Sequence, residues 1–271
     1  MLKTVRASAI ILALLIALPI AGFSSEDHPK KYGIDFMLGG SYYNLADVNE
    51  FVAHEKLAYI EPDKIHIGTQ LGIGLIYRQE DNFGWQFGYN KLFSGVPIAM
   101  EQTYKVETTI IGATRLSTVE QKISGSEWYA LATWYAGWGQ SKELMFGIGP
   151  AFYNASLDRS TILYDPNPSA IASGNFTDAN GKAMGLIAMI GLELPIGENT
   201  GLCFQGGVRS AKVGRVSYDD PTAEDANNTT EVDLNSYSNS KLPIDFSGAF
   251  GKITIRTYFS PTSDWRTPER H

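Results

Sequence analysis

The sequence is poor in three features that define common classes of protein. Its 271 residues include one cysteine, Cys203, so an internal disulfide framework and a cysteine-rich zinc site are both excluded. Basic residues are outnumbered, with 22 Lys and Arg against 29 Asp and Glu, whereas a nucleic-acid-binding domain is usually basic. Only the N-terminus has an apolar run near the roughly 20 residues of a membrane-spanning helix, which argues against a helical membrane protein. What remains is an acidic chain with 27 glycines and 12% aromatic residues.

The N-terminal apolar run has the organisation of a secretory signal peptide. Lys3 and Arg6 precede an almost wholly apolar stretch, 7–22, and small residues follow at Ser24 and Ser25. The alternative is an N-terminal membrane anchor, but the stretch is short and a polar segment, SSEDHPKK, comes directly after it. We predict a signal peptide over 1–24, followed by a periplasmic segment over 25–31.

From residue 32 onward, apolar side chains alternate with small or polar ones, a period of two that is typical of β-strands. Within 83–90, for example, FGWQFGYN has an aromatic residue at every second position. This pattern predicts eight strands, at 32–44, 65–78, 83–93, 122–136, 143–157, 182–196, 201–216 and 242–259.

The connections between the predicted strands are alternately short and long. Short turns fall at 79–82, 137–142 and 197–200, and long loops at 45–64, 94–121, 158–181 and 217–241. This order predicts an all-β fold, an eight-stranded antiparallel up-and-down β-barrel with short turns at one rim. Residues 98–110 and 113–123 also alternate, which indicates a hairpin that extends the third and fourth predicted strands beyond the membrane, or two further barrel strands that would give ten.

The composition of the two strand faces distinguishes a soluble barrel from a membrane barrel. One face is apolar, whereas the other has many glycines and few charges, which suits the crowded interior of a narrow barrel better than a solvated exterior. Aromatic residues that favour the lipid headgroup level gather near the short turns. These predicted girdle residues are Tyr77, Phe83, Trp85, Trp134, Trp138, Phe204 and Phe259. The patterns favour a transmembrane barrel over a lipocalin-like one.

The last predicted strand carries Ile253, Ile255, Thr257 and Phe259 on one face, a pattern similar to the C-terminal assembly signal of outer-membrane barrels. The chain resembles the small bacterial outer-membrane β-barrels of the OmpA transmembrane domain and OmpX type, over 32–259. In most relatives the aromatic residue is the last one, whereas here a tail of residues, 260–271, follows. The resemblance implies the outer membrane as location, a monomer, and membrane lipids, lipopolysaccharide and the barrel-assembly machinery as partners.

Charged residues that the alternation places on the inner face comprise four acids and four bases. They are Asp35, Arg78, Glu127, Glu143, Glu193, Arg209, Lys252 and Arg256. Asp35 and Arg256 lie on the first and last strands, which must pair to close the barrel. Because an isolated charge in a narrow lumen is unfavourable, we expect an ion-paired plug, as in relatives, with a gated ion path as the alternative.

The sequence contains no specific signature of catalysis or metal binding. His54 with Glu55, and His66, lie near the long-loop rim, where a lipid A-modifying barrel enzyme would need a base, but their spacing is not diagnostic. No His or Cys set has metal-ligand spacing, and no cofactor is expected. The long loops are acidic, which favours solvation or weak divalent-cation binding. We expect a structural or surface-interaction protein, with a small-solute channel second and an enzyme third.

Overall fold

The computed structural model describes residues 31–48, 66–93, 101–110, 113–137, 142–163, 176–219, 229–231, 233–235 and 238–259. Several predictions fall on residues outside these ranges: the signal peptide, the segment 25–30, parts of the four long loops with His54 and Glu55, Trp138, and the tail 260–271. Within the described ranges, no helix is long and apolar enough to cross a membrane.

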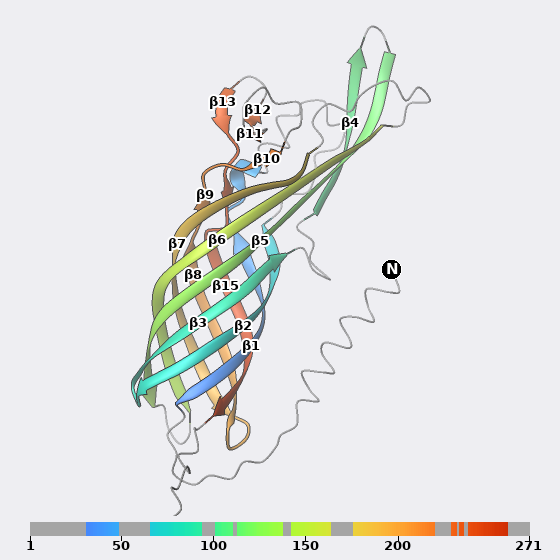
Figure 1. The fold of residues 1–271 in the computed structure, drawn as a ribbon. Helices are drawn as coiled ribbons and strands as arrows, with labels where there is room; N and C mark the ends of the chain where they lie inside the picture. The colour runs from blue at the N-terminus through green and yellow to red at the C-terminus, as the bar shows by residue number, and fades with distance from the viewer. Residues whose placement is uncertain are drawn as a thin grey trace, which may run out of the picture.

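Eight antiparallel strands form a closed barrel, which confirms the predicted fold (Figure 1). They are β1 (Tyr32–Tyr43), β2 (Ile67–Glu80), β3 (Phe83–Phe93), β5 (Ala113–Gly137), β6 (Glu143–Leu163), β7 (Phe176–Pro195), β8 (Thr200–Ser210) and β15 (Gly248–Phe259). Each strand pairs with the next, and β1 closes the ring by pairing with β15, from Tyr32 opposite Phe259 to Tyr43 opposite Gly248.

One wall of the barrel continues past the long-loop rim. Strand β4 (Glu101–Ile110) pairs with Ala113–Lys122 of β5, beyond the point where β3 leaves β5 at the Leu92–Gly125 pair. Strand β6 stays paired with β5 as far as Leu163. Figure 1 shows β4 and the upper part of β5 standing clear of the barrel. The ten-strand alternative is wrong, because among the described residues β4 pairs with β5 alone.

Side chains alternate strictly between the lumen and the outer wall. On β15, Lys252, Thr254 and Arg256 point inward and are buried, whereas Ile253 between them is 52% exposed. The barrel therefore has a polar interior and an apolar exterior, the reverse of a soluble barrel.

The predicted strands 201–216 and 242–259 are wrong at their long-loop ends. Strand β8 ends at Ser210 and β15 begins at Gly248, and the intervening segments turn into the barrel mouth as the short pair β9 (Lys212–Val213) and β14 (Ile244–Asp245). Apolar alternation continues through both segments, so it does not reveal that the chain has left the wall. Four short strands lie beyond them: β10 (Ser217–Asp219), β11 (Thr229–Glu231), β12 (Asp233–Asn235) and β13 (Ser238–Lys241).

These inward-turning segments, together with the end of β1 and the residues that follow it, build an apolar cap over the lumen, and the members of the cap are completely buried. The cap comprises Tyr43, Leu45, Val48, Val213, Val216, Leu242, Ile244 and Phe246. Phe246 reaches across the mouth, since its ring lies 5.5 Å from that of Tyr43 on β1 and also packs against Gly125 on β5. Backbone bonds fix the cap to the wall, including Phe246 N–H donating to the Ala211 carbonyl at 2.8 Å.

Gly248, where the chain leaves the cap and enters β15, occupies a backbone conformation that requires glycine. Its φ is +151°, and a Cβ would collide with the carbonyl of Tyr42. We expect Gly248→Ala to lower the free energy of unfolding by about 1–3 kcal/mol, measured by urea titration in micelles. Gly251→Ala on the same strand is the control, because nothing lies within 4 Å of its Cβ position. Equal effects from the two substitutions would show that the Gly248 conformation is not constrained.

Candidate functional site

The inward-facing charges occupy three levels of the lumen. Five lie toward the short turns and form a group that we call the short-turn cluster: Asp35, Arg78, Glu143, Glu193 and Arg256. Two lie toward the cap, Glu127 and Arg209, and Lys252 lies between the two groups. All eight residues that the sequence placed on the inner face therefore point into the lumen.

Arg256 is the centre of the short-turn cluster and is completely buried. Its Nε donates to Asp35 Oδ1 at 2.8 Å, and its Nη2 donates to Asp35 Oδ2 at 3.0 Å. The third nitrogen, Nη1, donates to Glu193 Oε2 at 2.8 Å. Asp35 and Arg256 are direct partners in the β1–β15 register. This bidentate ion pair therefore lies between the two strands whose pairing closes the barrel.

Arg78 links the same cluster across the lumen, from β2 to β6 and β7. Its guanidinium forms an ion pair with Glu143, and it donates to the Tyr258 hydroxyl at 3.0 Å. That hydroxyl in turn donates to Glu193 Oε2 at 2.8 Å. The guanidinium also lies 4.0 Å from the ring centroid of Tyr135, so cationic and aromatic groups fill this end together.

Arg209 makes a similar set of contacts in the part of the lumen nearest the cap. Its Nη1 donates to Glu127 Oε2 at 2.8 Å, and its Nη2 donates to Gln70 Oε1 at 2.7 Å and Ser41 Oγ at 2.9 Å. Asn90 donates to the other oxygen of Glu127 at 2.5 Å. These contacts join Arg209 on β8 to β5 on one side and to β1 and β2 on the other. They therefore cross the lumen just beneath the cap.

Lys252 extends from β15 to the opposite wall of the barrel. Its Nζ donates to the Tyr129 hydroxyl at 3.4 Å and to Met37 Sδ at 3.3 Å. Gln86 bridges this level to the short-turn cluster, since its Nε2 lies 3.5 Å from Tyr129 Oη and 3.0 Å from Asp35 Oδ2. A continuous hydrogen-bonded network thus runs along the lumen from Lys252 to Arg256.

Glycines on the inner face make room for the large lumen side chains. A Cβ on Gly88 would collide with the Tyr129 ring, and a Cβ on Gly191 would press on Met145 and Gln205. Packing this close indicates that the middle of the lumen is filled by side chains, as an eight-stranded barrel allows.

The outer wall carries the predicted aromatic residues, apart from Trp138, which lies outside the described ranges. Phe83 packs against Trp85 and Trp134, with ring centroids 5.6 and 5.5 Å apart. Tyr77 stacks on Tyr32, an aromatic residue that the sequence analysis did not single out. Phe259 is 49% exposed at the end of β15.

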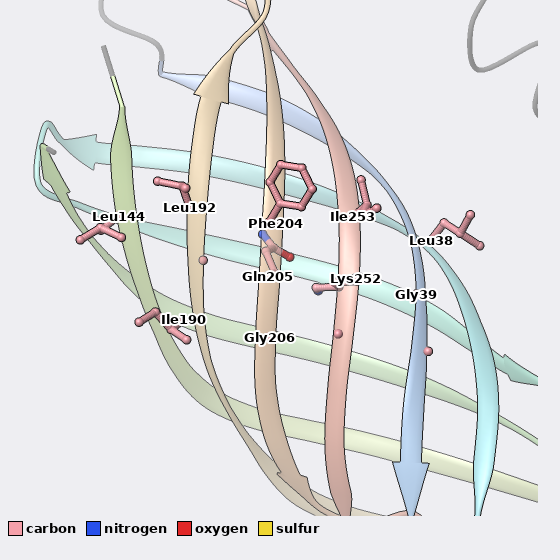
Figure 2. Close-up of a pocket in the computed structure, with 13 residues that line it drawn as sticks. Leu38, Gly39, Leu144, Ile190, Leu192, Phe204, Gln205, Gly206, Lys252 and Ile253 are labelled. Carbon is pink, nitrogen blue, oxygen red and sulfur yellow. The ribbon is translucent and has the colours of Figure 1, made fainter. Parts of the chain in front are cut away.

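Phe204, the remaining predicted girdle residue, lies between Leu192 and Ile253 on an apolar stretch of wall (Figure 2). A groove of about 670 Å³ runs beside it, over the adjacent glycines Gly40, Gly251 and Gly206 of β1, β15 and β8. The Lys252 and Gln205 side chains start from the same strands but are buried in the lumen. The groove is therefore an apolar feature of the exterior.

A second group of aromatic residues lies toward the long-loop rim and was missed by the sequence analysis. The rings of Tyr89 and Trp128 lie 4.6 Å apart, and Tyr42 stacks on His66 at 5.5 Å. The signal is present in the sequence, since Tyr89 and Trp128 continue the outward alternation of β3 and β5 toward the long loops. His66 is thus engaged with an aromatic ring. Within the described ranges, no three His, Cys, Asp or Glu side chains gather as a metal-binding group.

No protein-family model and no curated protein sequence matches the chain. Among solved structures, OprG, an outer membrane protein from Pseudomonas aeruginosa, is 14% identical, with a TM-score of 0.40, and the match covers 86% of this chain and 98% of OprG. Neisserial surface protein A is 12% identical, with a TM-score of 0.38. That match covers 86% of this chain and 100% of the Neisserial protein. Ail, the attachment invasion locus protein of Yersinia pestis, is 8% identical, with a TM-score of 0.36 and coverage of 84% and 97%. These likenesses are too weak to assign a family, so the resemblance to the OmpA and OmpX type stays a prediction.

A double-mutant cycle tests whether Arg256 and Asp35 interact in the folded protein. Arg256→Gln leaves the buried carboxylate of Asp35 without an ion pair and leaves Glu193 with only the longer 3.9 Å ion pair to Arg78, and we expect it to lower the free energy of unfolding by about 3–5 kcal/mol. Asp35→Asn should be milder, because Arg256 keeps Glu193, and the double variant should be more stable than Arg256→Gln alone.

Urea titration in micelles, followed by tryptophan fluorescence, measures all three variants. The control is Asp47→Asn, which breaks the partly exposed pair with Lys212 and should change stability by less than about 1 kcal/mol. Strictly additive effects of the Asp35 and Arg256 substitutions would show that the two side chains do not interact.

Proposed function

We propose that the chain is an outer-membrane β-barrel with a closed lumen, and that it acts as a structural or surface-interaction protein, not as an enzyme or an open channel. Two features of the barrel together support this proposal: its exterior is apolar, and its lumen is obstructed at two levels. The exterior accounts for insertion into a bilayer, and the obstruction argues against passage through the barrel.

The height of the apolar exterior supports insertion. Tyr32 and Tyr42 lie at opposite ends of β1, and for a tilted strand their separation along the barrel axis is about 25 Å. This matches the apolar band of roughly 25 Å in outer-membrane barrels. Between them, Leu38 is 50% exposed, and Ile73 and Leu75 on the neighbouring β2 are 47% and 57% exposed. Large apolar side chains exposed over this height support the proposal that this wall faces lipid.

The two obstructions differ in chemistry. The ionic network of Asp35, Arg256, Arg78 and Glu193 crosses the lumen near the short turns, while the apolar cap around Phe246 fills the opposite mouth. An ion moving through the lumen would have to break buried ion pairs and then displace the tightly packed apolar side chains of the cap, and both steps are unfavourable.

The proposed orientation follows from the chain order. With a cleaved signal peptide, the N-terminus would begin in the periplasm, and the long loops with the β4–β5 extension would face the cell exterior. We propose that this extended wall, together with the acidic loops, is the surface through which the protein contacts its surroundings. Outer-membrane lipids, lipopolysaccharide and the assembly machinery are its proposed partners, with the chain acting as a monomer.

Conductance measurements in planar bilayers test the closed lumen. We expect no stepwise conductance from the purified full chain, because the short-turn cluster and the cap both block the path. An open porin inserted under the same salt and voltage is the control for the bilayer, and a heat-modifiable gel band is the control for folding. Regular, reproducible conductance steps from the folded protein would contradict the proposed closed lumen.

A further inference from the structure

On the outer wall toward the long-loop rim, one row of polar side chains crosses four neighbouring strands. The register places Lys91 of β3 opposite Ser126 of β5, Ser126 opposite Asn154 of β6, and Asn154 opposite Lys182 of β7. Strands lie about 4.8 Å apart, so the two lysine backbones are about 14 Å apart, with a hydroxyl and an amide between them. This is a row of hydrogen-bond donors with a cation at each end.

Directly beneath this row, on the membrane side, lies a row of large apolar side chains. Tyr89, Trp128, Phe152 and Met184 occupy the adjacent outward positions of the same four strands. Trp128 is 60% exposed, Phe152 55% and Met184 67%. A groove of about 530 Å³ runs between the rows, bordered by Trp128, Phe152 and Met184 on one side and Ser126, Asn154 and Lys182 on the other.

Both lysines are available to an external anion. Each is exposed, and neither has an ion pair or hydrogen bond within the described part of the chain. Two carboxylates on the same strands have other partners. The carboxylate of Asp158, farther along β6, accepts a hydrogen bond from the backbone N–H of Asp178 at 2.7 Å. Glu127, the neighbour of Ser126, points into the lumen and is engaged by Arg209.

We propose that this groove, together with Lys91 on the strand beside it, binds a phosphorylated lipid of the outer leaflet. The phosphate lies between Lys91 and Lys182, where the two ammonium groups and the Ser126 hydroxyl and Asn154 amide can donate to its oxygens. The acyl chains lie over Trp128, Phe152 and Met184. The inference rests on the proposed membrane insertion and adds a specific lipid headgroup site to it.

The observations favour a lipid over a free phosphate ion. The donors border an exposed aromatic surface instead of a closed pocket, and they lie at the boundary between the apolar wall and the polar rim. A headgroup anchored by its own acyl chains is held at this depth, whereas a free anion would gain only the weak attraction of two solvated lysines. The larger groove beside Phe204 has an almost wholly apolar lining and offers no comparable headgroup contact.

Native mass spectrometry of the full chain, released from micelles, tests the site. The probes are dioleoyl phosphatidic acid and dioleoyl phosphatidylcholine, which share acyl chains and differ in headgroup charge. We expect the wild-type protein to retain phosphatidic acid preferentially. For the double variant Lys91→Gln, Lys182→Gln, the retention of phosphatidic acid should fall by roughly tenfold or more. Inorganic phosphate added at millimolar concentration should not displace the lipid.

The matched control is the double variant Lys31→Gln, Lys142→Gln, which removes the same charge at the short-turn rim and should bind like the wild type. Unchanged preference for phosphatidic acid in Lys91→Gln, Lys182→Gln would overturn the proposed site, and so would an equal loss in the control. Displacement by inorganic phosphate would also overturn it, in favour of a simple anion site. Failure of membrane insertion itself would give a different result, namely a protein that carries neither micelle nor lipid.

Discussion

The pairing of β1 with β15 over twelve residues closes the barrel, and the other features depend on this closure. A closed sheet has no edge, so the backbone hydrogen bonds of the wall are satisfied within it and the wall can face lipid. Eight strands enclose only enough space for side chains. The inner face must therefore accommodate large groups such as Tyr129 and Arg256 against glycines, while the outer face is free to be apolar.

The lumen contains equal numbers of acidic and basic side chains over its whole length, but the two signs are not equal at each level. The short-turn cluster has three carboxylates and two guanidinium groups, while Arg209 pairs with Glu127 near the cap. Lys252, whose direct contacts are Tyr129 and Met37, supplies the remaining positive charge between them. Burial makes net charge unfavourable, so the eight charges are balanced as a set, and their contacts link β1, β2, β3, β5 to β8 and β15 across the lumen. These links across the interior support the proposed role as a structural protein.

Much of the fold could be predicted from the sequence, because period-two alternation identifies strands and assigns each side chain to one face. The inward positions of Asp35 and Arg256 followed from that alternation and from the need for first and last strands to pair. The cross-lumen partners, such as Arg78 with Glu143, could not be predicted, since they depend on the stagger of strands around the ring. The cap was missed because Val213 and Ile244 alternate in the same way whether they face lipid or the barrel mouth.

Site-directed spin labelling of β15 in bilayers can determine whether the outer wall of the barrel faces lipid. In a Cys203→Ala background, nitroxides would be placed at Ile253 and Ile255 on the outer wall, and at Lys142 near a short turn as a water-exposed reference. If the wall faces lipid, nitroxides at Ile253 and Ile255 will collide frequently with dissolved oxygen and rarely with a water-soluble nickel chelate, and the nitroxide at Lys142 will do the opposite. Frequent nickel collisions at Ile253 and Ile255 would contradict the proposed lipid-facing wall, because the wall would then face water.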